Sequence, residues 1–354
     1  MSSIQSKNTE DLKSWYTDNQ QTYINLAKKV ETIIQELLDA EGVTYYSITS
    51  RAKDVDSFLR KSQKDKYQDP KQQIQDLAGI RVITYMRSEV TRACEIIKPL
   101  FKIDEKNSVN KSSELGNDKV GYRSVHYVAC LTEERLALPE YKMFKDFCFE
   151  IQVRTLLEHA WADITHDRSY KFKGNFPPDY DIERRFSLVS ATLELVDREF
   201  DSIVNTFNKY ERETEGKSRK GEYNLPLNAT TLENYLQNKL NDQIKRGALT
   251  PTFREGESII IEELLNFGIN NIEELDKMVN SMINKNPEII KSGNNFIGLL
   301  RDVMMLTDID LYFKNAWQNH WQGLGISFIK IAKKIGIDID QYIDKYELDV
   351  HYEE

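Results

Sequence analysis

Charged and apolar side chains alternate along residues 147–154 of the sequence. Successive side chains of a β-strand point to opposite sides, so Glu150, Gln152 and Arg154 are expected on one face and the apolar residues between them on the other. A carboxylate, an amide and a guanidinium in one row are not typical of a core face, because charged groups are rarely buried without partners. This strand is therefore expected to present a functional face.

A second strand, expected over residues 122–131, has the same character. Tyr122, Ser124 and His126 project to one side of it. Taken alone, Tyr122 suits an aromatic residue on the surface of a sheet, and His126 suits a structural histidine with satisfied hydrogen bonds. Two strands thus offer polar faces.

Two carboxylates stand close to these expected strands. Asp76 precedes a strand expected over residues 79–85, and Glu150 lies within the strand described first. Mg²⁺ prefers carboxylate oxygens and keeps water and phosphate as its remaining ligands. We expect Asp76 and Glu150 to hold one Mg²⁺, and two carboxylates with a metal indicate phosphoryl chemistry.

Basic residues gather upstream, where Arg51, Lys53 and Lys61 flank Ser57 on an expected short loop and helix. Such cations neutralise a triphosphate. Considered by themselves, they are more typical of a solvated basic face. Both interpretations stay open at this level.

These strands need a scaffold, and a long amphipathic helix is expected over residues 12–38, where apolar residues fall at helical spacing. Strand and helix patterns then alternate, which predicts an α+β fold with a mixed β-sheet flanked by helices. The other expected elements are strands at 79–85, 122–131 and 147–154, helices at 90–101, 155–166 and 182–207, and a polar, mobile loop at 102–120.

A charged, turn-rich stretch marks the expected domain boundary. We predict a first domain over residues 1–207, a linker over 208–230 and an α-helical domain over 231–354. Short helical patterns at 259–267, 272–283 and 326–335 support the last assignment. This second domain is expected to be a regulatory or interaction module.

Composition excludes several classes of protein. A net charge of −9 over 354 residues argues against a uniformly basic nucleic-acid binder. No apolar run approaches the roughly 20 residues that span a bilayer, and residues 1–10 do not resemble a secretory signal, so a cytoplasmic protein without membrane contact is expected. The cysteines Cys94, Cys130 and Cys148 are odd in number and widely spaced, and we expect them to be reduced.

The polar positions form an ordered string of motifs. The string is Arg51-x-Lys53, Asp76-x-x-Gly79-x-Arg81, Gly121-Tyr122-Arg123-Ser124-x-His126 and Glu150-x-Gln152-x-Arg154-Thr155, followed by Trp161-Ala162 and His166. Each motif is weak alone, but all of them in order are a specific signal. The string resembles the synthetase domain of the RelA/SpoT alarmone family, whose members make (p)ppGpp from ATP and GDP or GTP, and the resemblance covers residues 10–207.

The resemblance implies a nucleotidyltransferase-like fold, a GTP pyrophosphokinase activity and a role for each polar residue. On the ATP side, Arg51 and Arg81 stack on adenine. Asp76 binds Mg²⁺, and Glu150 binds the metal or takes the proton of the attacking hydroxyl. The remaining implied residues are Lys53, Ser57 and Lys61 for the ATP phosphates, and Tyr122, Arg123, Ser124, His126, Gln152, Arg154 and His159 for the acceptor nucleotide.

Two further hypotheses remain. Small synthetases of the family carry an asparagine near the guanine where this chain has His159, and the helix looks like that of toxic members, some of which pyrophosphorylate the 3′ end of tRNA. In that case the second domain is expected to be a fused antitoxin or a phage sensor. The other hypothesis is a non-catalytic nucleotide-binding regulator, which has little need for both Asp76 and Glu150. Family members often form oligomers, so self-association is a further expectation.

Overall fold

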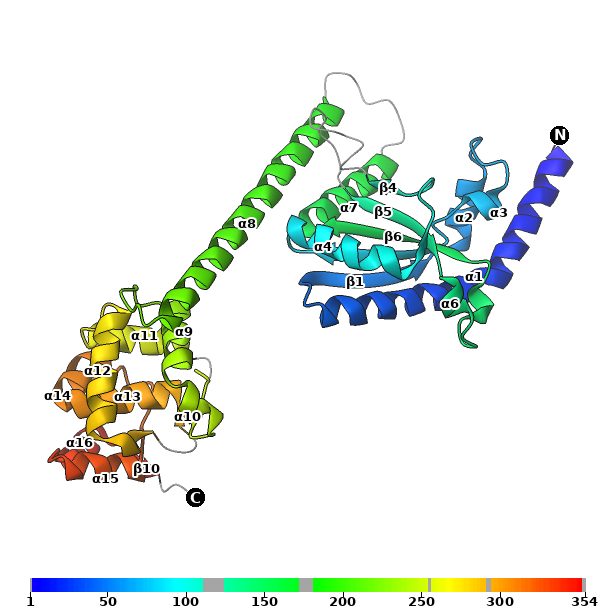
Figure 1. Cartoon of the computed structure of the whole chain (residues 1–354). Helices are drawn as coiled ribbons and strands as arrows, with labels where there is room; N and C mark the ends of the chain where they lie inside the picture. Colours follow the sequence, from blue (N-terminus) through cyan, green and yellow to red (C-terminus); the bar gives the residue numbers. More distant parts are fainter. Residues whose placement is uncertain (1, 111–123, 172–180, 254–255, 291–293, 352–354) are drawn as a thin grey trace. The chain divides into compact units, whose positions relative to one another are not determined.

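The computed structural model describes residues 2–110, 124–171, 181–253, 256–290 and 294–351. Contacts within the chain divide it into two compact units, Met1–Val204 and Asn205–Glu354, called here the N-terminal and C-terminal units. The division falls inside one long helix, α8 (Ile182–Arg219) (Figure 1).

The N-terminal unit is built on a six-stranded sheet of order β1-β2-β6-β5-β3, with β4 paired to β5. Only the β2–β6 pair is parallel among the described strands of this sheet, so the predicted mixed sheet is confirmed. The strands are β1 (Tyr45–Ala52), β2 (Ala78–Thr84), β3 (Lys102–Ile103), β4 (Val109–Asn110), β5 (Val125–Cys130) and β6 (Cys148–Thr155).

Helices cover the sheet and supply its core. The predicted first helix is confirmed as part of α1, whose Tyr16, Leu26 and Val30 are fully buried and pack into the same core as the apolar side of β6. Figure 1 shows α1 running along the sheet, with α4 beside it. The helices of this unit are α1 (Ser2–Ala40), α2 (Val55–Ser62), α3 (Pro70–Gln73), α4 (Arg87–Ile97), α6 (Glu133–Leu136), α7 (Leu156–Lys171) and the first part of α8.

The C-terminal unit is α-helical, as predicted. The helix α13 is buried along most of its length and forms the centre of a core separate from that of the sheet. Two small parallel strand pairs, β7 (Leu249–Thr250) with β8 (Asn294–Asn295) and β9 (Gly323–Gly325) with β10 (Asp349–His351), tie loops together. The helices are α9 (Ala229–Lys239), α10 (Asn241–Lys245), α11 (Glu257–Asn266), α12 (Ile272–Lys285), α13 (Phe296–Thr307), α14 (Ile309–Leu311), α15 (Ile326–Lys334) and α16 (Ile339–Tyr346).

Two segments differ from expectation. Residues 208–219, expected as linker, continue α8, because their charges pair one turn apart, as in Lys209–Glu213 and Arg219–Glu215. The predicted loop at 102–120 contains β3 and β4, and its residues 111–120 lie outside the described part of the chain. No described helix is long and apolar enough to span a membrane.

The expectation of three reduced cysteines is wrong for two of them. Cys130 and Cys148 are joined by a disulfide, while Cys94 is free. The two partners end β5 and begin β6, and the antiparallel register places them directly opposite each other with Cα atoms 4.5 Å apart. Sequence spacing does not reveal this pairing, because it depends on the register of two strands.

Candidate functional site

Polar side chains gather on one face of the sheet because the register of four strands aligns them. Arg81 on β2 stands opposite Gln152 on β6, which in turn stands opposite His126 on β5. Arg51 on β1 pairs with Gly79, and Gly79 pairs with Glu150. Paired positions share a face, so the alternation predicted from residues 147–154 extends across the sheet.

The other face of the same strands is the core. Phe149, Ile151 and Val153 on β6 are fully buried, whereas Glu150 and Gln152 are partly accessible. The apolar contacts with α1 and α4 hold the sheet from behind. The polar face is therefore mounted on a packed scaffold, which limits how far its side chains are displaced.

A cavity of about 330 Å³ opens on the polar face. Its size is within the range of small-molecule sites, roughly 300–1,000 Å³. It brings together seven residues that the sequence predicted as functional, and it adds Asp54, Gly79 and residues 49–50, which were not predicted. The lining residues are Thr49, Ser50, Arg51, Ala52, Lys53, Asp54, Ser57, Asp76, Gly79, Ile80, Arg81, Glu150 and Gln152.

The carboxylate of Asp76 lies between two ammonium groups. Its Oδ2 is 2.8 Å from Nζ of Lys53 and 2.9 Å from Nζ of Lys61. Burial alone would raise the pKa of Asp76, but the two lysines hold it below its ordinary value. The second oxygen, Oδ1, is buried and accepts no hydrogen bond from the residues that the structure describes. An ionised carboxylate with an open oxygen is suited to a cation.

Local structure places these cations. The side chain of Asp54 caps the N-terminus of α2 by accepting from the backbone N–H of Ser57, which starts the helix that carries Lys61. The backbone carbonyl of Lys53 accepts from the hydroxyl of Tyr16 at 2.6 Å, which ties this strand end to α1. Lys61 does not line the cavity but contacts Asp76 from its edge.

Glu150 is held by its two polar neighbours on the sheet. Nδ1 of His126 lies 2.9 Å from Oε1, and the amide of Gln152 donates to Oε2 at 2.9 Å. Burial would raise the pKa of Glu150, but the hydrogen bonds and charge supplied by His126, with the bond from Gln152, keep it below its usual value. Glu150 is thus an ionised carboxylate at neutral pH.

The segment that carries the polar face also matches a known protein family. Residues 50–175 match the family described as "Region found in RelA / SpoT proteins". Residues 50–175 are thus a region similar to RelA/SpoT proteins. The match spans the whole polar face and ends in the segment before α8, so α8 and the C-terminal unit lie outside it.

Three proteins of known name are similar to parts of this chain. The GTP pyrophosphokinase YjbM of Bacillus subtilis (strain 168) is 27% identical over 162 residues, which cover 44% of this chain and 70% of that protein. The structure of small alarmone synthetase 1 from Bacillus subtilis is 21% identical, with a TM-score of 0.46, over 55% of this chain and 98% of that one. A GTP pyrophosphokinase family protein from Streptococcus pneumoniae is 22% identical, with a TM-score of 0.46, over 56% and 96%.

Of the residues predicted to bind the acceptor, Gln152 lines the cavity, whereas Arg154 and His159 are not among its lining residues. Oδ1 of Asp163 on α7 is 3.7 Å from Nη2 of Arg154 and 3.5 Å from Nδ1 of His159. Burial, followed by the charge of Arg154, lowers the pKa of His159. Tyr122 and Arg123 lie outside the described residues, as does the side chain of His166. Their predicted roles therefore stay predictions.

The start of α7 in the RelA/SpoT region is fixed by a reciprocal cap that was not predicted. The backbone N–H of Thr155 donates to Glu158 at 3.0 Å, and the backbone N–H of Glu158 donates to the hydroxyl of Thr155 at 3.1 Å. The Thr155 hydroxyl also donates to the buried carboxylate of Asp197 on α8 at 2.7 Å. The spacing Thr-x-x-Glu is the signal that would have revealed this cap.

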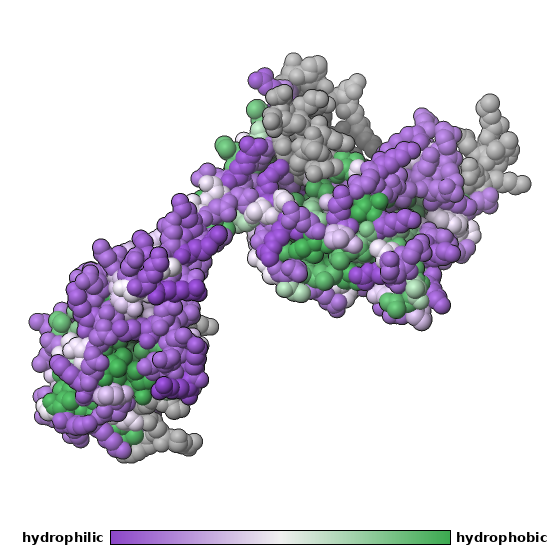
Figure 2. All heavy atoms as spheres, in the orientation of Figure 1, coloured by the Kyte–Doolittle hydropathy of each residue, from purple (hydrophilic) through white to green (hydrophobic). Residues whose placement is uncertain are grey.

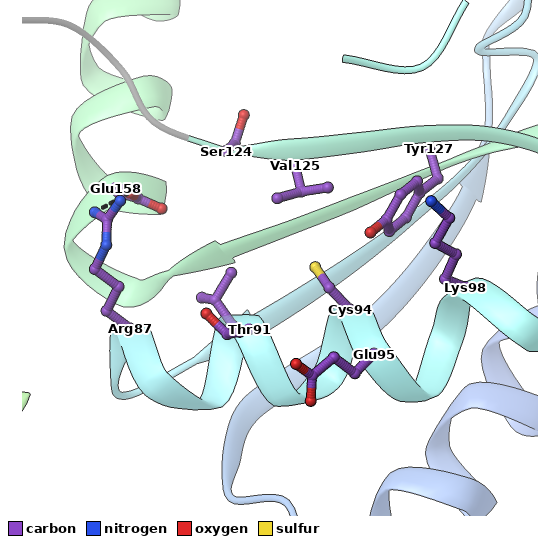
Figure 3. A pocket seen from close by; sticks show the side chains of 10 residues that line it. Arg87, Thr91, Cys94, Glu95, Lys98, Ser124, Val125, Tyr127 and Glu158 are labelled. Atoms are coloured by element: carbon purple, nitrogen blue, oxygen red, sulfur yellow. Dashed lines mark ion pairs between the residues drawn. The ribbon is translucent and has the colours of Figure 1, made fainter. Parts of the chain in front are cut away.

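A second cavity, of about 250 Å³, lies between α4, β5 and α7. Ser124, predicted for the acceptor, is one of its lining residues, and Figure 3 shows Val125 and Tyr127 pointing into it. The Arg87 guanidinium stands 3.7 Å from Glu158 at its edge (Figure 3). Burial raises the pKa of Glu158 to about 7, so this carboxyl titrates near neutral pH.

Proposed function

We propose that the polar face transfers the β,γ-diphosphate of ATP to the 3′-hydroxyl of GDP or GTP, forming (p)ppGpp and releasing AMP. The observation that carries the proposal is the meeting of four cations and two ionised carboxylates at one cavity in a RelA/SpoT region. The name of the 27% identical relative, a GTP pyrophosphokinase, supports the same chemistry.

The donor end of the site suits ATP. Arg51 and Arg81 come from neighbouring strands at the cavity and would stack on the adenine ring. Lys53 and Lys61 neutralise Asp76 in the structure. A triphosphate offers them stronger anionic partners, so on binding we expect both ammonium groups to turn toward the phosphates, with Ser57 as a further donor.

When the two ammonium groups turn from Asp76 to the phosphates, the carboxylate of Asp76 becomes available to Mg²⁺. Asp76 and Glu150 would hold the ion, and Oδ1 of Asp76 is already open. Among the described residues, no group of three or more His, Cys, Asp or Glu side chains gathers as a metal site, so phosphate and water oxygens must complete the set. When bound, Mg²⁺ supplies charge neutralisation for the transferred group.

The reaction requires alignment and charge neutralisation more than covalent help from the protein. The acceptor O3′ forms a bond to the β-phosphorus while the bond from that phosphorus to the oxygen bridging it to the α-phosphorus breaks, and AMP leaves with the electron pair. Glu150 would take the hydroxyl proton, or it would bind the metal while that proton passes to water; its low pKa supports the metal role. His126, Gln152 and Arg154 would order the acceptor.

One observation favours a different acceptor. His159 lies beside Arg154 on the helix that closes the acceptor side, where the family resemblance calls for an asparagine near guanine. The 3′ end of tRNA offers the same hydroxyl and adds phosphates outside the pocket. In that case the C-terminal unit would act as a fused antitoxin or a sensor of a phage component.

Label transfer distinguishes these acceptors. Purified full-length protein is mixed with Mg²⁺ and ATP labelled at the γ-phosphate, with GDP, GTP or bulk tRNA as separate acceptors and Glu150→Gln as control. Label on GDP or GTP that disappears in the control supports the proposal. Label on tRNA alone identifies tRNA, and not GDP or GTP, as the acceptor. Nucleotide binding without transfer to any acceptor favours a non-catalytic regulator.

A further inference from the structure

One carboxylate of helix α8 is withdrawn from water. Hydrophilic residues are spread over the visible face of the N-terminal unit, where water solvates them (Figure 2). Asp197 differs from these residues, because its exposed fraction is only 2%. It lies in the part of α8 that belongs to the N-terminal unit, which ends at Val204. A buried carboxylate costs free energy unless it has specific partners, so the partner of Asp197 indicates its role.

The partner of Asp197 is the residue that joins β6 to α7. The hydroxyl of Thr155, which is fully buried, donates to Oδ2 of Asp197 at 2.7 Å. A hydroxyl has a single hydrogen, so this bond fixes the direction in which the lone pairs of Thr155 point. One lone pair accepts from the backbone N–H of Glu158 at 3.1 Å, which caps the start of α7. Donation to a carboxylate also strengthens the hydroxyl as an acceptor, because hydrogen bonds in a chain polarise one another.

Residues predicted to bind the acceptor stand on both sides of this cap. Arg154 precedes Thr155 in β6, and His159 lies in the first turn of α7. Oδ1 of Asp163, one turn further along α7, is 3.7 Å from Nη2 of Arg154 and 3.5 Å from Nδ1 of His159. The direction of the first turn of α7 therefore decides where these groups lie relative to one another.

The donor side of the polar face is built from other elements. The lining of the 330 Å³ cavity comes from β1, β2, α2, β6 and the loops next to them. Among the residues that the structure describes, none of α7 or α8 lines this cavity. A fault in the cap of α7 should therefore disturb the acceptor side and leave the ATP side in place.

We propose that Asp197 is a positioning residue for the acceptor side: by holding the hydroxyl of Thr155, it fixes the start of α7 and with it Arg154 and His159. The inference rests on the proposed diphosphate transfer, in which these two side chains meet the acceptor nucleotide. Asp197 acts through Thr155 and needs no contact with nucleotide or metal. It also lies outside residues 50–175, the segment that matches the family, so the family motifs do not point to it.

Equilibrium dialysis of the full chain tests this role, with labelled GDP and, separately, with the α,β-methylene analogue of ATP. Asp197→Leu keeps the size of the side chain but accepts no hydrogen bond. The dissociation constant for GDP should therefore rise by about tenfold, and that for the ATP analogue by no more than about twofold. Asp197→Asn keeps an oxygen for the Thr155 hydroxyl and should bind GDP within about threefold of wild type. An Asn variant as weak as the Leu variant contradicts the route through Thr155.

Asp201 provides the matched control. It stands one turn along α8 and accepts from the backbone N–H and the hydroxyl of Ser88, so it docks the same helix against α4 instead of α7. Asp201→Leu should leave both dissociation constants within about twofold of wild type. Equal loss of GDP binding in Asp197→Leu and Asp201→Leu, or equal loss of GDP and of the ATP analogue in Asp197→Leu, overturns the proposal.

The double variant Thr155→Val/Asp197→Leu tests whether the two residues act through one bond. Thr155→Val already removes the hydroxyl, so adding Asp197→Leu should weaken GDP binding no further, whereas additive losses contradict the route. Binding is measured without turnover, so the proposed function is judged separately. Wild type that binds GDP but transfers no label fails the proposed function alone, and unchanged GDP binding in Asp197→Leu fails the positioning role alone. Wild type that binds no GDP overturns both.

Discussion

Both units of the chain contain buried or partly buried charged side chains, but the hydrogen bonding of these side chains differs between the units. In the C-terminal unit, Glu263 on α11 is fully buried and its two oxygens accept hydrogen bonds from Arg301 and from the hydroxyl of Tyr312 at 2.9 Å. On the polar face of the sheet, Asp76 and Glu150 line an open cavity, and Oδ1 of Asp76 accepts nothing from the described residues. A closed network serves the fold, whereas an open one is arranged for a ligand.

The energetic consequences of the two arrangements are opposite. Breaking a closed buried pair leaves a charge without compensation, so the cost appears in folding stability. Lys53 and Lys61 are both paired with Asp76, and a ligand that replaces these interactions gains binding energy from side chains that are already positioned. Substitutions in one region should therefore change stability, and substitutions in the other should change activity.

The largest effect is expected for Glu150→Gln. The substitution keeps the shape but removes the charge, so the rate of label transfer should fall by about 10³- to 10⁴-fold, while the thermal midpoint stays close to that of wild type. The measurement is initial-rate transfer at saturating ATP and Mg²⁺. A loss of less than tenfold in the transfer rate would show that Glu150 does not take a direct part in the reaction.

Next in size is Glu263→Gln, which leaves Arg301 without its charged partner. The free energy of unfolding of the C-terminal unit should fall by about 3–5 kcal/mol, measured by chemical denaturation of the full chain. Glu263→Met/Arg301→Met removes both charges and should be less destabilised than the single variant. Equal stability of Glu263→Gln and wild type would show that the pair does not hold the unit together.

A pH-dependent effect is expected for Glu158. Its folded pKa of about 7 lies above the ordinary value of 4.5, so the folded state binds the extra proton between these values. The contribution of this proton to the free energy of unfolding is fully present below about pH 4.5 and is lost as the pH rises through 7. Glu158→Gln cannot lose a proton, so its stability relative to wild type should increase between pH 5 and pH 8, by about 2–3 kcal/mol. A constant difference across this range contradicts the raised pKa.

The smallest effect is expected at the edge of the cavity. Lys61→Met removes one phosphate ligand and should raise the KM for ATP by about tenfold with little change in kcat, because a single exposed charge–phosphate contact contributes about 1–2 kcal/mol. Lys64→Met, at an exposed position of the following turn, serves as control. If both variants raise the KM equally, the effect comes from overall charge and not from Lys61.

Much of the polar face was predictable, because strand alternation and motif order depend on neighbours in the sequence. Glu150 and Gln152 lie on the expected face for this reason. The disulfide between Cys130 and Cys148, the contact of Asp197 with Thr155 and the Glu263–Arg301 pair join residues 18 to 42 positions apart. Such contacts depend on register and packing, which local patterns do not encode.

The extent of α8 was missed for a different reason. The charges after Asn208 suggested a linker, but charges spaced one turn apart also stabilise an exposed helix. Composition alone does not separate these two cases, whereas apolar residues that recur every 3.5 residues on average from Ile182 to Tyr210 favour the helix.

The central claim, transfer of a diphosphate at the polar face, is tested most directly by following three labels. ATP labelled in turn at its α-, β- and γ-phosphates is incubated with the protein, Mg²⁺ and GDP, and the products are separated. The account predicts that the β and γ labels move together onto the acceptor while the α label stays in AMP. Appearance of the α label on the acceptor, or of the γ label without the β label, would contradict it.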